Sequence, residues 1–186
     1  VVLQGQVKLR SFTESGKESI IDIAGPEDVF GPLDRVFASD NRVPLASPDG
    51  FATEAIGLSD GVAVRFSLKE FKKMVGNRPM VSVSVSRFLG LKNTQFQLRL
   101  SRLLYRTSLG KLAGMLLELA ERYGEEGENE RLLIDFRLTH QELASMVGVK
   151  RETVSECMGM LEERELVRLG KKRIEILQPD ALAEIT

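Results

Sequence analysis

The sequence is poor in the residues that support metal, redox or disulfide chemistry. Its 186 residues include one cysteine and one histidine. A single cysteine excludes an intramolecular disulfide and a four-thiolate iron–sulfur cluster within the chain. A single histidine leaves no ligand cluster for a metal enzyme or for a haem in a β domain. We therefore expect no cofactor, no metal site and no catalytic residues, so the chain is not expected to be an enzyme.

Long apolar runs and a large excess of charge are also missing. No stretch approaches the roughly 20 apolar residues of a membrane span, and no signal peptide is recognisable, so we expect a cytoplasmic protein without a membrane partner. The formal net charge of -1 excludes a globally basic surface, so any nucleic acid must be bound by a local basic patch. Because the chain opens on Val1 in strand-like sequence, without an initiator Met, we expect an N-terminal segment to be missing.

Residues 139–163 predict two short helices joined by a tight turn. Thr139 and Glu142 have the spacing of a capping box, which begins a helix. Gly148 suits the positive φ of a turn. Apolar residues recur at helical spacing on both sides of this turn: Leu143, Ala144, Met146 and Val147, then Val154, Cys157, Met158 and Leu161. Because the second helix keeps a polar outer face, the pattern predicts a helix-turn-helix.

A basic hairpin follows this motif directly. Residues 166–169 and 174–177 read as strands, and residues 170–173 (Gly-Lys-Lys-Arg) form the turn between them. A helix-turn-helix with such a wing is a DNA-binding unit. The alternative, an ordinary helical hairpin with a solvated polar face, does not explain the basic wing.

Upstream of this unit the pattern changes twice. Residues 1–66 carry short apolar alternations broken by glycine, including a turn at 14–17, and predict antiparallel hairpins of a barrel or jelly roll. A capping box at Ser67 and Glu70 predicts a short helix ending at Gly76. Thr107 or Ser108 is expected to cap a further helix ending at Gly124, followed by an acidic solvated loop at 125–130 and a strand at 132–136.

Between these regions, residues 79–105 predict one long helix with an apolar seam. Leu89, Phe96 and Leu103 recur every seven residues, as in a coiled coil. A helix of roughly 40 Å, at 1.5 Å per residue, is too long to be covered by one small β domain. We therefore expect a homodimer with these interface residues: Val85, Phe88, Leu89, Phe96, Leu100 and Leu103.

The segment THQELASMVGVKRETVSECMGMLEERELV, residues 139–167, resembles the DNA-binding end of the cyclic-AMP receptor and fumarate-nitrate regulator family. Arg-Glu-Thr-Val at 151–154 is its most specific part, and a weaker resemblance covers essentially the whole chain. It implies an α+β fold: an N-terminal β-roll of jelly-roll, cyclic-nucleotide-binding type at 1–76 as sensor, a dimerisation helix at 77–106, and a C-terminal winged helix-turn-helix at 107–186. It further implies a transcription regulator, as an activator contacting RNA polymerase, on palindromic duplex DNA.

The resemblance also assigns side chains to DNA. The outer face of the second helix would read bases through Arg151, Glu152, Ser155 and Glu156. The DNA backbone would be contacted by Thr139, His140, Lys150, Thr153, Lys171, Lys172 and Arg173. This chain departs from the family where Lys150 replaces a capping Ser or Thr and where Glu156 replaces a basic residue.

The sensor departs from the family more strongly. Residues 28–33 resemble the start of the family's phosphate-binding cassette, but Pro32 stands where cyclic-nucleotide binders keep a glutamate. Residues 51–52 (Phe-Ala) stand where the family's Arg-Ser pair holds the cyclic phosphate. We therefore expect no control by cyclic AMP and leave the effector unknown. The alternatives are a remodelled pocket for another ligand, possible through Arg35 or Arg42 if it is anionic; a repressor; and a small-molecule-binding module with a degenerate DNA end.

Overall fold

The N-terminal part of the chain folds into short antiparallel strands, as the sequence predicts. The computed structural model describes residues 1–12, 18–31, 54–127 and 131–185. The strands are β1 (Val2–Gln4), β2 (Val7–Phe12), β3 (Glu18–Ala24), β4 (Glu54–Gly57) and β5 (Val62–Ala63). They form a sheet of order β3-β2-β4 and a two-stranded sheet of β1 and β5. The β2–β3 hairpin is confirmed, with Phe12 opposite Glu18; its expected turn at 14–17 lies outside the described residues.

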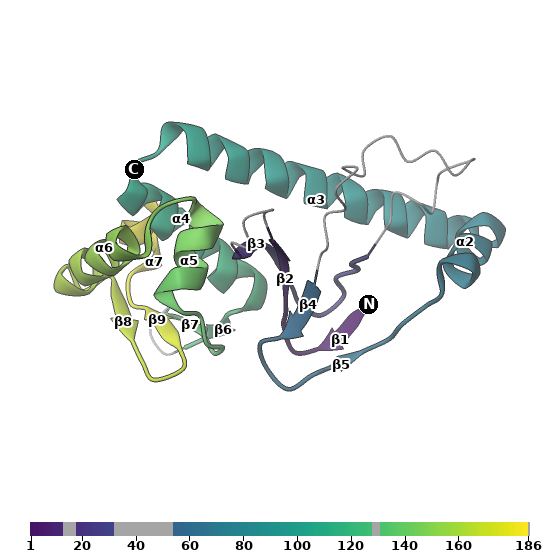
Figure 1. The fold of residues 1–186 in the computed structure, drawn as a ribbon, viewed down its shortest axis with the longest axis horizontal. Helices are drawn as coiled ribbons and strands as arrows, with labels where there is room; N and C mark the ends of the chain where they lie inside the picture. Colours follow the sequence, from purple (N-terminus) through teal and green to yellow (C-terminus); the bar gives the residue numbers. More distant parts are fainter. Residues whose placement is uncertain (13–17, 32–53, 128–130, 186) are drawn as a thin grey trace.

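Two helices follow the strands and lead away from them. The predicted capping box at Ser67 and Glu70 is confirmed and begins α2 (Leu68–Asn77). This helix ends one residue later than predicted because the Arg78 amide still donates to the Met74 carbonyl, at 3.1 Å. Pro79 begins the predicted long helix α3 (Pro79–Tyr105), which continues unbroken for 27 residues. In Figure 1 α3 runs along the length of the molecule, from α2 at one end to the C-terminal helices at the other.

The C-terminal part is a helical layer packed on a small sheet. Its helices are α4 (Ser108–Tyr123), α5 (His140–Val147), α6 (Arg151–Glu163) and α7 (Pro179–Ala183). Its sheet has the order β6-β7-β9-β8, formed by β6 (Glu125–Glu126), β7 (Leu132–Ile134), β8 (Val167–Leu169) and β9 (Ile174–Ile176). The predicted wing strands are therefore present as β8 and β9.

Two details of α4 and the following loop differ from the sequence-based expectation. Thr107, rather than Ser108, caps α4 by accepting from the Gly110 amide at 3.1 Å. Gly124 ends the helix with φ of -78°, so positive φ is not what requires glycine there. An added Cβ would lie 2.4 Å from the Ala120 carbonyl oxygen. The expected solvated loop at 125–130 is wrong in part, because residues 125–126 form β6 and pair with β7.

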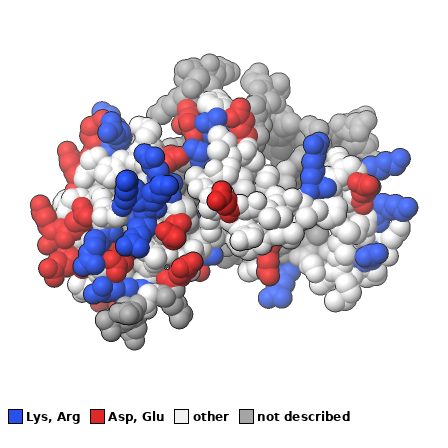
Figure 2. Space-filling model, turned by 90° about the horizontal axis from the view of Figure 1, so that it is seen from below, with Lys and Arg blue, Asp and Glu red and all other residues white. Residues whose placement is uncertain are grey.

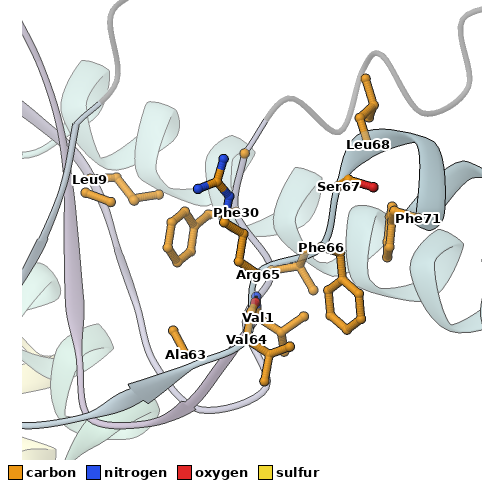
Figure 3. Close-up of a pocket in the computed structure, with 13 residues that line it drawn as sticks. Val1, Leu9, Phe30, Ala63, Val64, Arg65, Phe66, Ser67, Leu68 and Phe71 are labelled. Atoms are coloured by element: carbon orange, nitrogen blue, oxygen red, sulfur yellow. The ribbon is translucent and has the colours of Figure 1, made fainter.

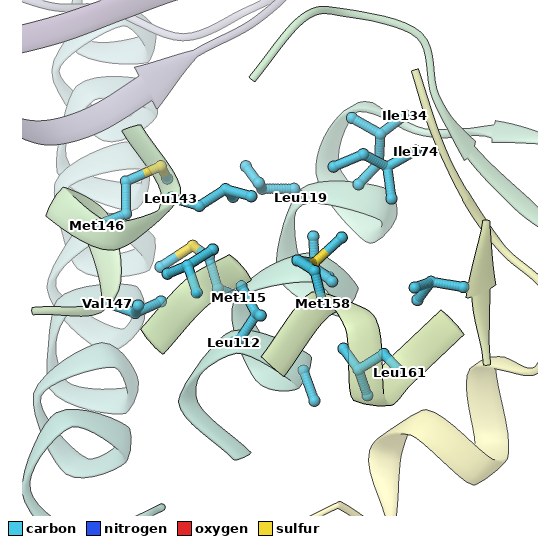
Figure 4. Packing of buried hydrophobic residues seen from close by; sticks show 14 of the residues in the cluster. Leu112, Met115, Leu119, Ile134, Leu143, Met146, Val147, Met158, Leu161 and Ile174 are labelled. Atoms are coloured by element: carbon cyan, nitrogen blue, oxygen red, sulfur yellow. The ribbon is translucent and has the colours of Figure 1, made fainter. Parts of the chain in front are cut away.

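One buried cluster joins the N-terminal strand β3 to the C-terminal helices. Leu112, Leu116 and Leu119 of α4 are fully buried at its centre, and α5 and α6 close over them (Figure 4). Ile20 and Ile23 of β3 belong to the same cluster. The strands and the helix-turn-helix therefore share a core. Residues on the two sides of the expected boundary at residue 107 pack together in it.

No helix among the described residues is long and apolar enough to cross a membrane.

Candidate nucleic-acid interface

The helix-turn-helix is built from local signals that the structure confirms. The Thr139 hydroxyl accepts from the Glu142 amide, and the Glu142 carboxylate accepts from the Thr139 amide at 2.8 Å. Gly148 ends α5 in the left-handed region, with φ of 69°, which costs glycine little and other residues about 1 kcal/mol or more. The Val149 amide then donates back to the Ala144 carbonyl at 3.1 Å. These contacts fix the direction in which α6 leaves the turn.

The two faces of α6 divide as the sequence predicts. Val154, Met158 and Leu161 are buried, which turns the opposite face outward. The expected base-reading residues all lie on that exposed face: Arg151, Glu152, Ser155 and Glu156. Burial, followed by the neighbouring Glu156 carboxylate, raises the pKa of the Cys157 thiol. Cys157 is therefore a small buried hydrophobe, because the thiolate needed for reactivity is disfavoured.

A basic groove of about 600 Å³ lies between the helix-turn-helix and the wing. It brings together residues that are far apart in sequence: Thr139 and His140 at the start of α5, Arg151 at the start of α6, and Lys171, Lys172 and Arg173 of the wing. Figure 2 shows lysine and arginine side chains gathered on this part of the molecule, on the left of the view. The groove also includes Arg137, which sequence reasoning missed because it precedes the helix-turn-helix motif.

The wing is held in a fixed position against α6. The Leu169 amide of β8 donates to a Glu162 carboxylate oxygen of α6 at 2.9 Å. Across the hairpin, the Gly170 amide donates to the Arg173 carbonyl at 2.9 Å. The basic tip of the wing is consequently presented beside the polar face of α6 and does not depend on a flexible linker.

His140 and Ser155 are in direct contact, although the sequence placed them in different roles. The His140 Nδ1 atom lies 2.8 Å from the Ser155 hydroxyl oxygen. The same hydroxyl donates to the Arg151 carbonyl at 3.1 Å. Fifteen positions separate the two residues in sequence, so only the crossing of α5 and α6 brings them together.

The N-terminal strands contact the helix-turn-helix directly. The Ile20 amide of β3 donates to the Ser145 hydroxyl of α5 at 2.7 Å. The Lys8 ammonium of β2 pairs with the Glu142 carboxylate of the capping box. Burial alone would raise the pKa of Glu142, but hydrogen bonds from Lys8 and Thr139 outweigh it and lower the pKa. A second groove, between β3 and α6, is lined by residues that include Glu18, Ser19, Lys150 and Glu152.

A cluster of ion pairs, here called the interdomain ion cluster, ties the N-terminal strands to α3 and α4. Its members are Asp22, Asp28, Lys92, Arg99, Arg102, Glu118 and Arg122. Asp22 is central, at 2.9 Å from Lys92, 2.9 Å from Arg99 and 3.2 Å from Arg122. Burial acts to raise the pKa of Asp22, but Arg99, Arg122 and Lys92 together hold it below its usual range.

The long helix α3 leaves an apolar face uncovered. Leu89, Phe96, Leu100 and Leu103 of the expected dimer seam are between 36% and 57% exposed. Phe88 is half-buried, with the Lys92 ammonium 5.7 Å from its ring centroid.

One expected member of the seam is corrected. Val85 is only 8% exposed because it packs with Phe71 and Val75 of α2 in its own chain. It is therefore not available to a partner helix.

An open cavity of about 960 Å³ lies between the N-terminal strands and α2. Apolar side chains that include Leu9, Phe30, Phe66 and Phe71 line it, and Arg65 adds one cation (Figure 3).

Several residues of the expected sensor, on which the prediction about cyclic AMP depends, fall outside the described part of the chain. These are Pro32, Arg35, Arg42, Phe51 and Ala52. The expectation about cyclic AMP therefore stays a prediction.

Comparisons with known proteins agree with this geometry. Residues 110–185 match the family of Crp-like helix-turn-helix domains. The chain is 27% identical over 183 residues to a CRP-like cAMP-activated global transcriptional regulator of Mycobacterium tuberculosis, covering 98% of this chain and 77% of that protein. It is 26% identical over 184 residues to the global nitrogen regulator of Synechococcus elongatus, covering 99% of this chain and 79% of that protein.

A solved structure shows the same fold. It is a transcriptional regulator of the CRP/FNR family from Thermus thermophilus, with a TM-score of 0.65 and 24% identity, covering 98% of this chain and 86% of that one. The α+β fold expected from the sequence is thereby confirmed. The relatives are regulators of transcription and not enzymes. Residues 110–185 therefore form a Crp-like helix-turn-helix domain, in a chain that is similar over nearly its whole length to regulators of transcription.

Proposed function

We propose that this regulator is a homodimeric activator that binds a palindromic operator through α6 and the wing. The observation that carries the proposal is the basic groove, in which Arg151 of α6 and the wing cations at 171–173 line one surface. Phosphates attract such cations regardless of sequence, whereas α6 offers donors and acceptors that can distinguish bases. Contact with RNA polymerase is proposed from the family resemblance.

The uncovered face of α3 supports the dimer. Leu89, Phe96 and Leu100 form a continuous apolar surface, because residues three, four and seven apart share one side of a helix. A second copy of the same helix would bury this seam. Two copies of α6 would then read half-sites one DNA turn apart, roughly 34 Å. An effector could act by favouring one of two dimer arrangements, of which only one has this spacing.

The base contacts follow from the chemistry of the exposed face of α6. Arg151 can donate two hydrogen bonds to guanine O6 and N7, and Glu152 can accept one from cytosine N4. We propose that this pair selects G·C steps, while Lys150, Thr153 and the wing cations contact phosphates. Glu156 would repel phosphates, so we expect the outer part of the half-site to differ from that of the cyclic-AMP receptor.

We also propose that cyclic AMP does not control this protein, although one relative is named as cAMP-activated. Pro32 and Phe51 stand where the family keeps a glutamate and an arginine for the nucleotide. Each lost charged contact costs about 1.5 to 3 kcal/mol, so the two losses should lower affinity by roughly two to four orders of magnitude. Isothermal calorimetry measures this directly. Binding of cyclic AMP at micromolar concentration would contradict the proposal.

The apolar cavity favours a second candidate, a regulator that responds to a ligand other than a nucleotide. Its lining is largely aliphatic and aromatic, with Arg65 as a cation, so an apolar carboxylate fits it better than a sugar phosphate. A screen of such ligands by thermal shift would detect binding through its stabilising effect.

Selection of binding sites from a random duplex pool tests the main proposal. The wild-type protein should enrich a two-fold symmetric sequence with half-site centres about 10 base pairs apart. The Arg151→Ala variant is the matched control and should enrich weaker or less defined sites. Enrichment of sequences without symmetry would contradict the dimeric reading, and no enrichment at all would favour a small-molecule-binding module with a degenerate DNA end. Repression and activation would then be distinguished by transcription from a promoter carrying the selected site.

A further inference from the structure

We propose that His140 is a positioning residue that makes Ser155 an obligate hydrogen-bond acceptor, so that Ser155 selects a base amino group. This inference rests on the proposed reading of DNA by α6. It reassigns His140, which the sequence alone placed at the DNA backbone, and it names the type of base that Ser155 recognises.

The hydrogen-bond geometry around Ser155 carries the argument. A serine hydroxyl has one hydrogen and two acceptor lone pairs. The Ser155 hydroxyl donates its hydrogen to the Arg151 carbonyl at 3.1 Å, the bond to residue i-4 that serine often makes in helices. The His140 Nδ1 atom is 2.8 Å from the same oxygen. Both contacts are hydrogen bonds only if His140 carries its proton on Nδ1 and donates it to Ser155.

This arrangement leaves Ser155 with one lone pair and no hydrogen to offer. Ser155 is exposed on the polar face of α6, one turn after Arg151. In the major groove, adenine N6 and cytosine N4 are donors, whereas guanine O6, guanine N7 and thymine O4 are acceptors. A Ser155 locked as an acceptor therefore favours adenine or cytosine at the base that it faces. An unrestrained hydroxyl could rotate and would accept from or donate to any of the four bases.

His140 is well placed to impose this restraint. It is the first residue of α5, between Thr139 and Glu142 of the capping box that fixes the start of that helix. The side chain is half-buried, which limits its motion. A histidine that instead contacted a phosphate would strengthen binding to every sequence about equally.

Titrations against four operators that differ only at the base facing Ser155 test the inference. That base is identified first, as the position where Ser155→Ala loses discrimination. Wild type should prefer adenine or cytosine over guanine or thymine about tenfold, and His140→Ala should reduce the preference to about threefold or less. His140→Asn should restore most of it, because its side-chain amide can donate from nearly the same position as Nδ1. The double variant Ser155→Ala/His140→Ala should distinguish the four operators as well as Ser155→Ala alone, because His140 acts only through Ser155.

The outcomes separate this inference from the proposed function. If wild type binds no selected operator, the proposed function itself fails. If wild type binds and His140→Ala weakens all four operators equally, with a salt slope lower by about one unit, His140 is a phosphate contact and the inference is wrong. It is also wrong if His140→Asn behaves like His140→Ala. Unchanged thermal unfolding of both His140 variants should show that the differences do not come from misfolding.

Discussion

At the scale of single residues, successive positions on the polar face of α6 carry a hydrogen-bond donor and a hydrogen-bond acceptor. Arg151 only donates, Glu152 as a carboxylate only accepts, and both are exposed. Lys172 of the wing differs from Arg151, because its ammonium is a point charge at the tip of an exposed hairpin and not a planar fork of donors. Arg151 and Lys172, which line the same groove, can therefore contribute separately to specificity and to affinity.

Substitutions at Arg151 and Lys172 should separate these contributions. Arg151→Ala should cost about 1 to 3 kcal/mol on the best operator and relax preference at one guanine per half-site. Lys172→Ala should weaken binding evenly and lower the salt slope by about one unit. Binding titrations on single-base operator variants at two salt concentrations measure both effects. An even loss across all variants for Arg151→Ala would assign Arg151 to a phosphate.

Residues whose role is local could be predicted from sequence, and residues whose role is tertiary could not. The capping box at Thr139 and the positive φ of Gly148 depend on neighbours within a few positions, and both are confirmed. Arg137 and the contact of His140 with Ser155 depend on how α5, α6 and the wing cross. No periodicity in the sequence encodes those crossings.

At the scale of elements, the sequence predicts the bounds of α3 correctly but not which of its residues pack against the rest of the chain. Its bounds, Pro79–Tyr105, agree with the prediction because no residue in it stops a helix. The seven-residue recurrence does not predict which side of α3 its own chain covers, and Val85, expected in the seam, packs on α2. Likewise β6 was missed, because a two-residue strand depends on its partner β7 and not on its own acidic sequence.

Charge introduced on the exposed side of α3 should dissociate the dimer. Leu89→Asp or Phe96→Asp would bury an unpaired carboxylate in the seam, at a cost of several kcal/mol. Light scattering at micromolar concentration should show a dimer for wild type and a monomer for either variant. Leu98→Asp is the matched control, since Leu98 is 53% exposed but lies two residues from Phe96 and hence on the opposite side of the helix. A monomeric wild type would refute the proposed interface.

At the scale of the whole molecule, the N-terminal strands and the helix-turn-helix pack as one body. The strand β3 supplies Ile20 and Ile23 to the core of the C-terminal helices and Asp22 to the interdomain ion cluster. The cluster also includes Asp28, which begins the segment that resembles the family's ligand-binding cassette. A change at that segment could therefore reach α3 through Lys92 and α4 through Arg122. This long-range pairing could not be predicted from sequence, because each partner alone reads as an ordinary surface charge.

The stability of this docked arrangement should depend on pH through Asp22. The pKa of Asp22 is lowered in the folded protein despite its burial, because three cations favour the carboxylate. A lowered folded pKa stabilises the protein above the unfolded value of about 3.9, and this stabilisation is lost as the pH falls through the folded pKa. Glu142, whose pKa is also lowered, should add to the loss in the same acid range.

Replacement of Asp22 by asparagine isolates this contribution. Asp22→Asn should lower the free energy of unfolding at pH 7 by about 3 kcal/mol, because Arg99 and Arg122 lose a buried partner. Between about pH 5 and pH 2 the variant should lose less stability than wild type, because the titrating group is gone. Urea unfolding at a series of pH values gives both quantities. Asp60→Asn, at an exposed carboxylate, should change neither by more than about 0.5 kcal/mol. Equal acid sensitivity of wild type and Asp22→Asn would show that Asp22 is not what couples stability to pH.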